Sequence, residues 1–321
     1  MNTHDISCRY DAVFRHSYAV ENPDMRRLYE NAKRDQWNAS RDIAWETPAP
    51  GDGFVADELI ELYGTPIWDK LSPEERIDLN RRVTAWRLSA LVYGEHGAML
   101  VCSQLVETVS GADEKLFQAT QVVDEGRHTE VLTRYIDERL KLTYPMPVAE
   151  KELFDTLLSG SSWPMKTIGL QLIAETFAVS LFRMLAETSK DDLLREICKR
   201  ILQDESRHMG FGMLALPDVV AGLTAGERAE LEEFTGWAIV NVLTGLRPDE
   251  VYREMGLRDG DIREARRARQ ERGGEAAFFR RTFRKDLHGS ILSNLRKIGL
   301  LGERVTSALA SAGVAVPAAP Q

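Results

Sequence analysis

Two short stretches of the sequence place a histidine three residues after a glutamate. They are VDEGRHTEVL, residues 123–132, and QDESRHMGFG, residues 203–212, and both contain the pattern Asp-Glu-x-Arg-His. The other four of the six histidines have no glutamate at that position. Because residues three apart on an α-helix project from one face, Glu125 with His128, and Glu205 with His208, can bind the same ion.

Two further glutamates extend this pattern over a longer range. Glu95 precedes Glu125 by 30 residues, Glu175 precedes Glu205 by 30, and the second set follows the first by 80. With about 1.5 Å of rise per residue and a turn expected midway, the two glutamates of each pair lie within about 3 Å of the same height on an antiparallel hairpin. Two such hairpins joined by a long crossover predict a four-helix bundle with six ligands at its centre.

The charge of this cluster indicates what it binds. Ionised glutamates gathered in an apolar core lose their hydration and repel one another, so they must be protonated, paired or bound to metal. Two divalent cations balance four carboxylates, and carboxylate with imidazole suits iron or manganese, which can bind dioxygen at open coordination positions. A single Glu-x-x-His is more often a surface pair, but the repeated spacing favours metal. The predicted ligands are Glu95, Glu125, His128, Glu175, Glu205 and His208.

Four neighbouring residues are predicted to support these ligands. Asp124 and Asp204 each precede a ligand glutamate and are placed to accept the ring N–H of the histidine across the bundle, which selects the histidine tautomer. Arg127 and Arg207 are predicted to pair with these aspartates. The alternative for all four is an ordinary salt bridge on a helix surface.

Other polar and apolar residues near the motifs allow two interpretations. Gln121 and Gln171 lie one turn before a ligand glutamate and either bind a water or substrate or are satisfied within the bundle. His96 points about 100° away from Glu95 and is predicted not to be a ligand. Three side chains either line a pocket beside the metals or pack in the core: Met99, Phe177 and Met209.

The elements that must position these residues are helices. Apolar residues recur at spacings of three and four, whereas strand alternation is missing. Ser72, Pro73 and Glu75 predict a capped helix start. The bundle helices are expected at about 73–109, 113–141, 164–188 and 191–216, with an extended section at 28–48, a Pro-containing connection before residue 164 and more helices from residue 224.

Length, composition and charge limit the domain organisation, the binding class and the cellular compartment. We predict one domain over residues 1–321, with a bundle core at about 73–216, an N-terminal extension at 1–72 and C-terminal helices at 217–321. A net charge of -9 argues against a general nucleic-acid binder. Three cysteines without ligand or disulfide spacing fit a reducing compartment. With no evident signal peptide or apolar span, a soluble cytoplasmic protein without a membrane partner is expected.

Together these residues resemble the ferritin-like di-iron carboxylate superfamily, whose ligand set is Glu, Glu-x-x-His, Glu, Glu-x-x-His. The resemblance covers about 75–215 and extends weakly to residues 29–38. It is nearest to the ribonucleotide-reductase-small-subunit-like oxidases and oxygenases, including ligand-binding oxidases, arylamine N-oxygenases and multicomponent monooxygenases. It implies an all-α ferritin-like bundle holding two Fe ions, or Mn/Fe. The implied function is a di-iron oxygenase or oxidase that uses dioxygen to hydroxylate, N-oxygenate or desaturate a small organic substrate.

The sequence departs from the pattern of each subfamily. Val179 replaces a hydroxylase threonine, Leu132 a radical tyrosine and Ile201 a seventh, histidine ligand of N-oxygenases; Leu170 and Ala98 replace the tyrosine and valine that ligand-binding oxidases crosslink. Tyr93 and Tyr135 are predicted to be packing residues. The alternatives are a ferritin-like ferroxidase or a radical-generating subunit. No flavin, nicotinamide or iron–sulfur motif is visible, so a separate reductase or ferredoxin is implied, and leftover apolar residues on the first bundle helix suggest a homodimer.

Overall fold

The computed structural model describes residues 4–14, 19–271, 275–314 and 316, and in these ranges the chain folds into helices without a named β-strand. The predicted all-α class is confirmed. The helices are α1 (Pro23–Arg34), α2 (Pro66–Lys70), α3 (Pro73–Thr108), α4 (Ala112–Tyr135), α5 (Val148–Ser159), α6 (Trp163–Thr167), α7 (Glu175–Thr188), α8 (Asp192–Gly222), α9 (Ala225–Gly245), α10 (Asp249–Glu254), α11 (Asp259–Glu271), α12 (Glu275–Lys297) and α13 (Glu303–Ser311). A 3₁₀ turn, η1 (Asp57–Leu59), and two π-helical segments, η2 (Ile136–Leu140) and η3 (Ile168–Ala174), complete the set.

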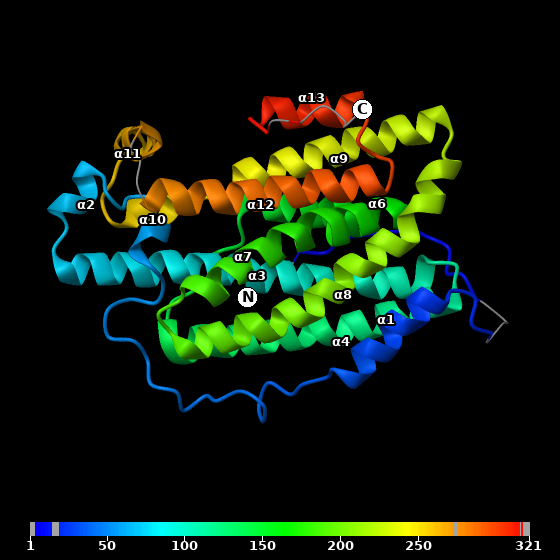
Figure 1. Cartoon of the computed structure of the whole chain (residues 1–321), viewed down its shortest axis with the longest axis horizontal. Helices are drawn as coiled ribbons and strands as arrows, with labels where there is room; N and C mark the ends of the chain where they lie inside the picture. Colours follow the sequence, from blue (N-terminus) through cyan, green and yellow to red (C-terminus); the bar gives the residue numbers. More distant parts are fainter. Residues whose placement is uncertain (1–3, 15–18, 272–274, 315, 317–321) are drawn as a thin grey trace.

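Four long helices form the bundle, as the spacing predicted. The α3–α4 hairpin lies beside the α7–α8 hairpin, and α6, η3 and α7 follow one another without a break (Figure 1). The predicted start of α3 is present as a full capping box. The Ser72 amide donates to Glu75 Oε2 at 2.8 Å, and the Glu75 amide donates to Ser72 Oγ at 3.2 Å. This cap satisfies amides that would otherwise lack a partner at the helix start.

A polar level separates two apolar clusters inside the bundle. Along α3 the residues up to Leu91 belong to one cluster and those from Ala98 belong to the other. The other three bundle helices also pass from one cluster to the other near their glutamate. Along α8 the two clusters come in the same order as along α3, and along α4 and the η3–α7 segment they come in the reverse order. The four residues at the change of cluster are Glu95, Glu125, Glu175 and Glu205, all buried. Apolar packing above and below therefore holds four carboxylates at one height.

The π-helical segment η3 leads directly into the third glutamate. The Glu175 amide donates to the carbonyl of Leu170, five residues earlier, instead of the residue four earlier. A π turn inserts one extra residue and so changes the direction in which the following side chains point. The same continuous helix, Trp163–Thr188, is long and apolar enough to cross a membrane, but 72% of its most apolar window is buried within the protein. Its composition is therefore explained by its place in the core.

Three local predictions were wrong. The N-terminal section expected to be extended begins within α1, which Asn22 caps by accepting the Met25 amide at 3.0 Å. The Pro-containing connection, in which no helix was predicted, contains α5. Helix α8 continues past Leu216 and through Pro217, which cannot donate a backbone hydrogen bond. The burial of Leu216 and Val220 on either side of this proline favours the continued helix.

Segments outside the bundle cover two of its sides. Helix α1 packs against α4 and α8, and the chain that follows it runs along the same side before reaching α3 (Figure 1). Helices α9 and α12 cover the other side and contact η3 and α7, and α13 packs on α9. The extension of the single predicted domain to all 321 residues stays a prediction.

Helix α5 lies very close to α3, and glycine permits this approach. A Cβ atom built on Gly97 would lie 2.5 Å from Cδ1 of the buried Phe154 ring. We expect Gly97→Ala to lower the free energy of unfolding by about 1–3 kcal/mol, the usual effect of overpacking a core. Gly289, also helical, has no atom within 4 Å of such a Cβ. Gly289→Ala should therefore stabilise by about 0.5–1 kcal/mol, and urea unfolding of both variants checks the opposite signs.

Candidate metal centre

The six side chains singled out by spacing lie together in the middle of the bundle. His128 Nδ1 is 3.2 Å from Glu95 Oε2, 3.4 Å from Glu125 Oε2 and 3.2 Å from Glu205 Oε1. His208 Nδ1 is 3.2 Å from Glu125 Oε1 and 3.1 Å from Glu205 Oε2. Both imidazoles are completely buried. One ring nitrogen of each histidine therefore faces a cage of carboxylate oxygens.

These donor atoms divide into two overlapping groups. The first group contains Glu95, Glu125, His128 and Glu205, and the second contains Glu125, Glu175 and His208, with the donor atoms of each group within 4.8 Å of one another. Glu125 belongs to both groups, and the two Glu205 oxygens approach different histidines. Glu95 and Glu175 each belong to only one group. The two groups would be able to hold two adjacent cations.

Burial and neighbouring charges shift the pKa values of three glutamates in the cluster. Burial raises the pKa of Glu95 well above its ordinary value, although the facing histidine opposes this. Burial and the nearby carboxylates raise the pKa of Glu175 well above its usual range. Burial also raises the pKa of Glu205, but the imidazoles and a hydrogen bond from Glu175 outweigh this effect and lower it overall. Without cations, Glu95 and Glu175 therefore favour their protonated forms.

The pKa of both histidines is shifted by the same surroundings. Burial lowers the pKa of His128 and His208, but the facing carboxylates outweigh it and raise both well above the ordinary value. The site therefore attracts positive charge of any kind. Divalent cations would replace the protons and supply that charge more compactly.

Unpaired oxygens test whether the residues fit a metal pair. In the part of the chain that the structure describes, three buried carboxylate oxygens of the cluster have no hydrogen-bond partner: Glu95 Oε1, Glu125 Oε2 and Glu205 Oε1. A buried carboxylate oxygen without a donor is costly unless a cation satisfies it. The combination of four carboxylates and two imidazole nitrogens, without thiolate, suits iron or manganese. The residues therefore fit a pair of such ions.

The two aspartates lie behind the histidines in the predicted reciprocal arrangement. His128 Nε2 is 3.0 Å from Asp204 Oδ2, and His208 Nε2 is 3.3 Å from Asp124 Oδ2. Each aspartate thus serves the histidine of the opposite helix. Because a carboxylate accepts and does not donate, it holds a proton on Nε2, so in the neutral imidazole the Nδ1 lone pair faces the cage.

The two arginines balance the charge of the aspartates. Arg127 Nη2 donates to Asp124 Oδ1 at 2.5 Å and to Asp204 Oδ2 at 2.9 Å, and Arg207 pairs with the same two carboxylates. Burial raises the pKa of both aspartates, but hydrogen bonds and charge from His128 and Arg127 lower the pKa of Asp204 far below its usual range. The pKa of Asp124 is also lowered. Both aspartates therefore stay ionised as acceptors.

The N-terminal arm contributes two residues that the sequence patterns did not single out as part of the site. Trp37 Nε1 donates to Asp204 Oδ2 at 2.8 Å, and its ring stacks on His128 with 6.4 Å between centroids. Gln36 Nε2 donates to Asp124 Oδ1 at 3.0 Å. The only signal was the Gln-Trp-Asn run at 36–38, which has no periodic relation to the bundle. Both aspartates are therefore also restrained from outside the bundle.

The structure also shows the positions of the other polar residues that the sequence singled out. Gln121 Nε2 donates to Glu125 Oε1 at 2.9 Å and to Glu175 Oε1 at 3.1 Å. Gln171 Nε2 donates to Gln121 Oε1 at 3.3 Å, whereas Gln171 Oε1 is buried without a hydrogen-bond partner among the described residues. His96 is exposed and points away from the cage. Tyr135 is buried and donates to Asp191 at 2.7 Å.

The three residues predicted to line a pocket or to pack in the core lie in different places. Phe177 lines the cavity described next. The Met99 sulfur instead lies 3.8 Å from where a Gly126 Cβ would be, and the Met209 sulfur lies 3.8 Å from Thr176 Oγ1. Methionine packing between helices accounts for both contacts.

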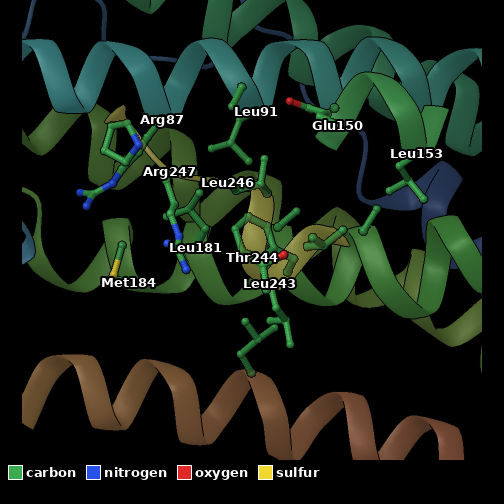
Figure 2. A pocket seen from close by; sticks show the side chains of 18 of the residues that line it. Arg87, Leu91, Glu150, Leu153, Leu181, Met184, Leu243, Thr244, Leu246 and Arg247 are labelled. Carbon is green, nitrogen blue, oxygen red and sulfur yellow. The ribbon is translucent and has the colours of Figure 1, made fainter. Parts of the chain in front are cut away.

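A cavity of about 390 Å³ reaches the cluster from one side. Glu95 and Glu175 form part of its wall, together with residues of α3, α5, η3, α7 and the loop after α9. Figure 2 labels the apolar wall residues Leu91, Leu153, Leu181, Leu243 and Leu246 and the charged residues Arg87, Arg247 and Glu150. Glu58, Glu61 and Arg269 also line the cavity. A small organic molecule fits this volume and composition.

Comparison with known proteins agrees with this site. The p-aminobenzoate N-oxygenase AurF family matches residues 21–291, which is most of the chain. A solved R2-like ligand-binding oxidase with an aerobically reconstituted Mn/Fe cofactor is 20% identical, covers 84% of this chain and 92% of its own, and has a TM-score of 0.51. A mutant of that oxidase with an anaerobically reconstituted Mn/Fe cofactor is 19% identical, with coverages of 87% and 94% and a TM-score of 0.49.

A comparison with curated protein sequences finds no match. The fold likeness and the family match nevertheless agree with the buried cluster of glutamates and histidines. The chain therefore belongs to the p-aminobenzoate N-oxygenase AurF family, within the ferritin-like di-metal oxidases and oxygenases.

Proposed function

We propose that this protein is a di-iron monooxygenase that inserts one oxygen atom of dioxygen into the amino nitrogen of a small aromatic amine. The observation that carries the proposal is the cavity, which brings a small molecule against Glu95 and Glu175. Family membership favours nitrogen oxidation over carbon hydroxylation or desaturation. The reaction converts an amine, dioxygen, two electrons and two protons into a hydroxylamine and water.

The six side chains of the cage would hold two iron ions, with a Mn/Fe pair as the alternative, through their carboxylate oxygens and the two Nδ1 atoms. When bound, the metal pair supplies the reduction and activation of dioxygen. The chain's own residues fix the charge and geometry of that centre. Asp124 and Asp204 hold each histidine in one tautomer, and the buried position excludes bulk water.

The far end of the cavity supports a substrate with an anionic group. Arg87 lies eight residues before Glu95 on α3, so the two residues are separated by about 12 Å along the helix. Its Nη2 donates to the Leu59 carbonyl at 2.6 Å, whereas Nη1 is buried without a hydrogen-bond partner among the described residues. Guanidinium groups bind carboxylates with two parallel hydrogen bonds. We infer that a carboxylated arylamine such as p-aminobenzoate lies with its amine toward the cage.

The electrons must come from another protein. A reductase or ferredoxin as the donor, a homodimeric state and a cytoplasmic location all stay predictions from the sequence. A ferritin-like store and a radical-generating subunit share the cage, but neither requires a cavity that leads to it.

An oxygen-isotope experiment tests the proposed function. The iron-loaded protein, a chemical reductant and p-aminobenzoate are incubated under oxygen-18 gas, and mass spectrometry then identifies the products. We expect a product that has gained one labelled oxygen atom on nitrogen, and no such product under nitrogen gas. Absence of labelled product from a panel of arylamines, together with uptake of iron far beyond two ions per chain, would instead favour iron storage.

A further inference from the structure

Glu150 is a buried carboxylic acid in the cavity wall that the metal cage does not use. It lies in the first turn of α5, is only 9% exposed, and lines the cavity together with Gly94, Glu95 and Glu175. Figure 2 shows it among the charged side chains of the cavity, reaching toward α3 near Leu91. Its acid group is therefore close to the part of the cavity that meets the cage.

Glu150 Oε2 is buried and has no hydrogen-bond partner among the described residues. Burial raises the pKa of Glu150 well above its ordinary value, and no neighbouring charge contributes to the shift. A glutamate at this helix position often closes a capping box, but that role needs a backbone N–H at the N-cap. The N-cap residue here is Pro147, which has none.

The position of Glu150 is nevertheless tightly determined by its neighbours. Asn241 Nδ2 of α9 donates to the Ala149 carbonyl at 2.6 Å. A Cβ built on Gly245 would lie 2.1 Å from Ala149 Cβ, so α9 packs directly against the start of α5. On the other side, a Cβ on Gly94 would lie 3.1 Å from Glu150 Oε1. The acid is held against the turn of α3 that presents Glu95.

We propose that Glu150 recognises the amino group of the substrate and places it beside Glu95 and Glu175. A primary amine donates two hydrogen bonds and accepts one, and a carboxylic acid group provides both an acceptor and, when protonated, a donor. The inference rests on the proposed function, because it assigns the amine to this end of the cavity and the anionic group to the other. It makes Glu150 a determinant of specificity for amines over apolar groups of the same size.

Two ligands that differ only at this group test the proposal. p-Aminobenzoate and p-methylbenzoate have nearly the same shape, and calorimetry on the metal-loaded protein without oxygen measures the Kd of each. We expect the wild-type protein to bind the amine roughly tenfold or more tightly, since the methyl group leaves the acid unpaired. Glu150→Leu should remove this preference and leave the affinity for p-methylbenzoate unchanged or improved. Glu150→Gln keeps a donor and an acceptor and should retain most of the preference.

Glu152 provides the matched control, because it lies on the same helix but is exposed. Glu152→Gln should leave both affinities unchanged. Glu150→Leu should also melt at or above the wild-type temperature, since it removes an unpaired acid. If it does not fold, Glu150→Met, with an unbranched side chain of similar length, repeats the comparison.

The outcomes separate the inference from the proposed function. A wild-type protein without preference for the amine, or a preference unchanged in the folded Glu150→Leu or Glu150→Met variant, overturns the role of Glu150. If a Glu150 variant keeps the preference for the amine and still forms labelled hydroxylamine, the role of Glu150 is overturned and the N-oxygenase function is supported. A preference that depends on Glu150, with no oxygenated product from the wild-type protein, would contradict the proposed function and support the inference.

Discussion

Replacing Glu175 with alanine is expected to lower the metal content from two ions to one or fewer per chain and to reduce turnover by more than about 100-fold. Glu175 is buried, faces His208 at 3.8 Å and receives a hydrogen bond from Gln121 at 3.1 Å. It is one of three residues in the second donor group, so its loss leaves Glu125 and His208 of that group, with one Glu205 oxygen 3.1 Å from His208. Removing a residue that only hydrogen-bonds a metal ligand typically lowers metal affinity or activity about 10- to 100-fold, and removing a ligand itself should lower them further.

Glu187 on the same helix provides the control for this variant. It is exposed near the end of α7 and lies three turns beyond Glu175. Glu187→Ala should keep two ions per chain and full turnover, as measured by elemental analysis and product formation. Two ions per chain in Glu175→Ala would be incompatible with the proposed ligand set.

Replacing Asp204 with alanine should reduce both stability and metal binding. Asp204 accepts hydrogen bonds from Trp37, Arg127 and Arg207 and faces His128 Nε2 at 3.0 Å. Its removal leaves buried guanidinium groups without their main counter-charge, which typically costs about 3–5 kcal/mol. The freed imidazole can also adopt the wrong tautomer, so we expect metal affinity to fall by about 10- to 100-fold. Urea unfolding of the metal-free protein separates the first effect from the second.

The control lies on the same helix. Asp218 is exposed on α8, and Asp218→Ala should change the free energy of unfolding by less than about 0.5 kcal/mol. Because Asp204 is ionised at neutral pH and its pKa in the folded protein is depressed, its stabilising effect is present above its unfolded pKa and is lost as the pH falls through the folded value. The stability difference between wild type and Asp204→Ala should therefore shrink in acid. A difference independent of pH would contradict the ion-pair explanation.

The bundle and its cage were accessible to sequence reasoning because their pattern is local. Glu125 and His128 are three residues apart, and each hairpin partner is 30 residues away across one turn. Helical rise and periodicity convert such spacings into heights and faces without further information. The reciprocal use of Asp124 and Asp204 follows from the same symmetry. The role of the six side chains as metal ligands stays a prediction that the Glu175 variant tests.

Local patterns were less informative outside the bundle. Helices α1 and α5 were missed because each has only 12 residues and a proline lies at the start of each. Proline marks a turn in sequence, but Pro23 is at the first position of α1 and Pro147 is the N-cap of α5. The end of α8 was placed too early for a related reason, since Pro217 lies within the helix.

The amino-acid sequence by itself determined the helical class, the level of the polar layer and the six side chains that meet there. Only the tertiary structure decided that Trp37 restrains a histidine partner and that Arg87 and Glu150 share a cavity with Glu95. The physical reason is the separation along the chain over which each kind of pattern acts. Helical periodicity relates residues on one helix or across one turn, whereas the cavity is formed by packing between segments whose separation along the chain carries no periodic signal.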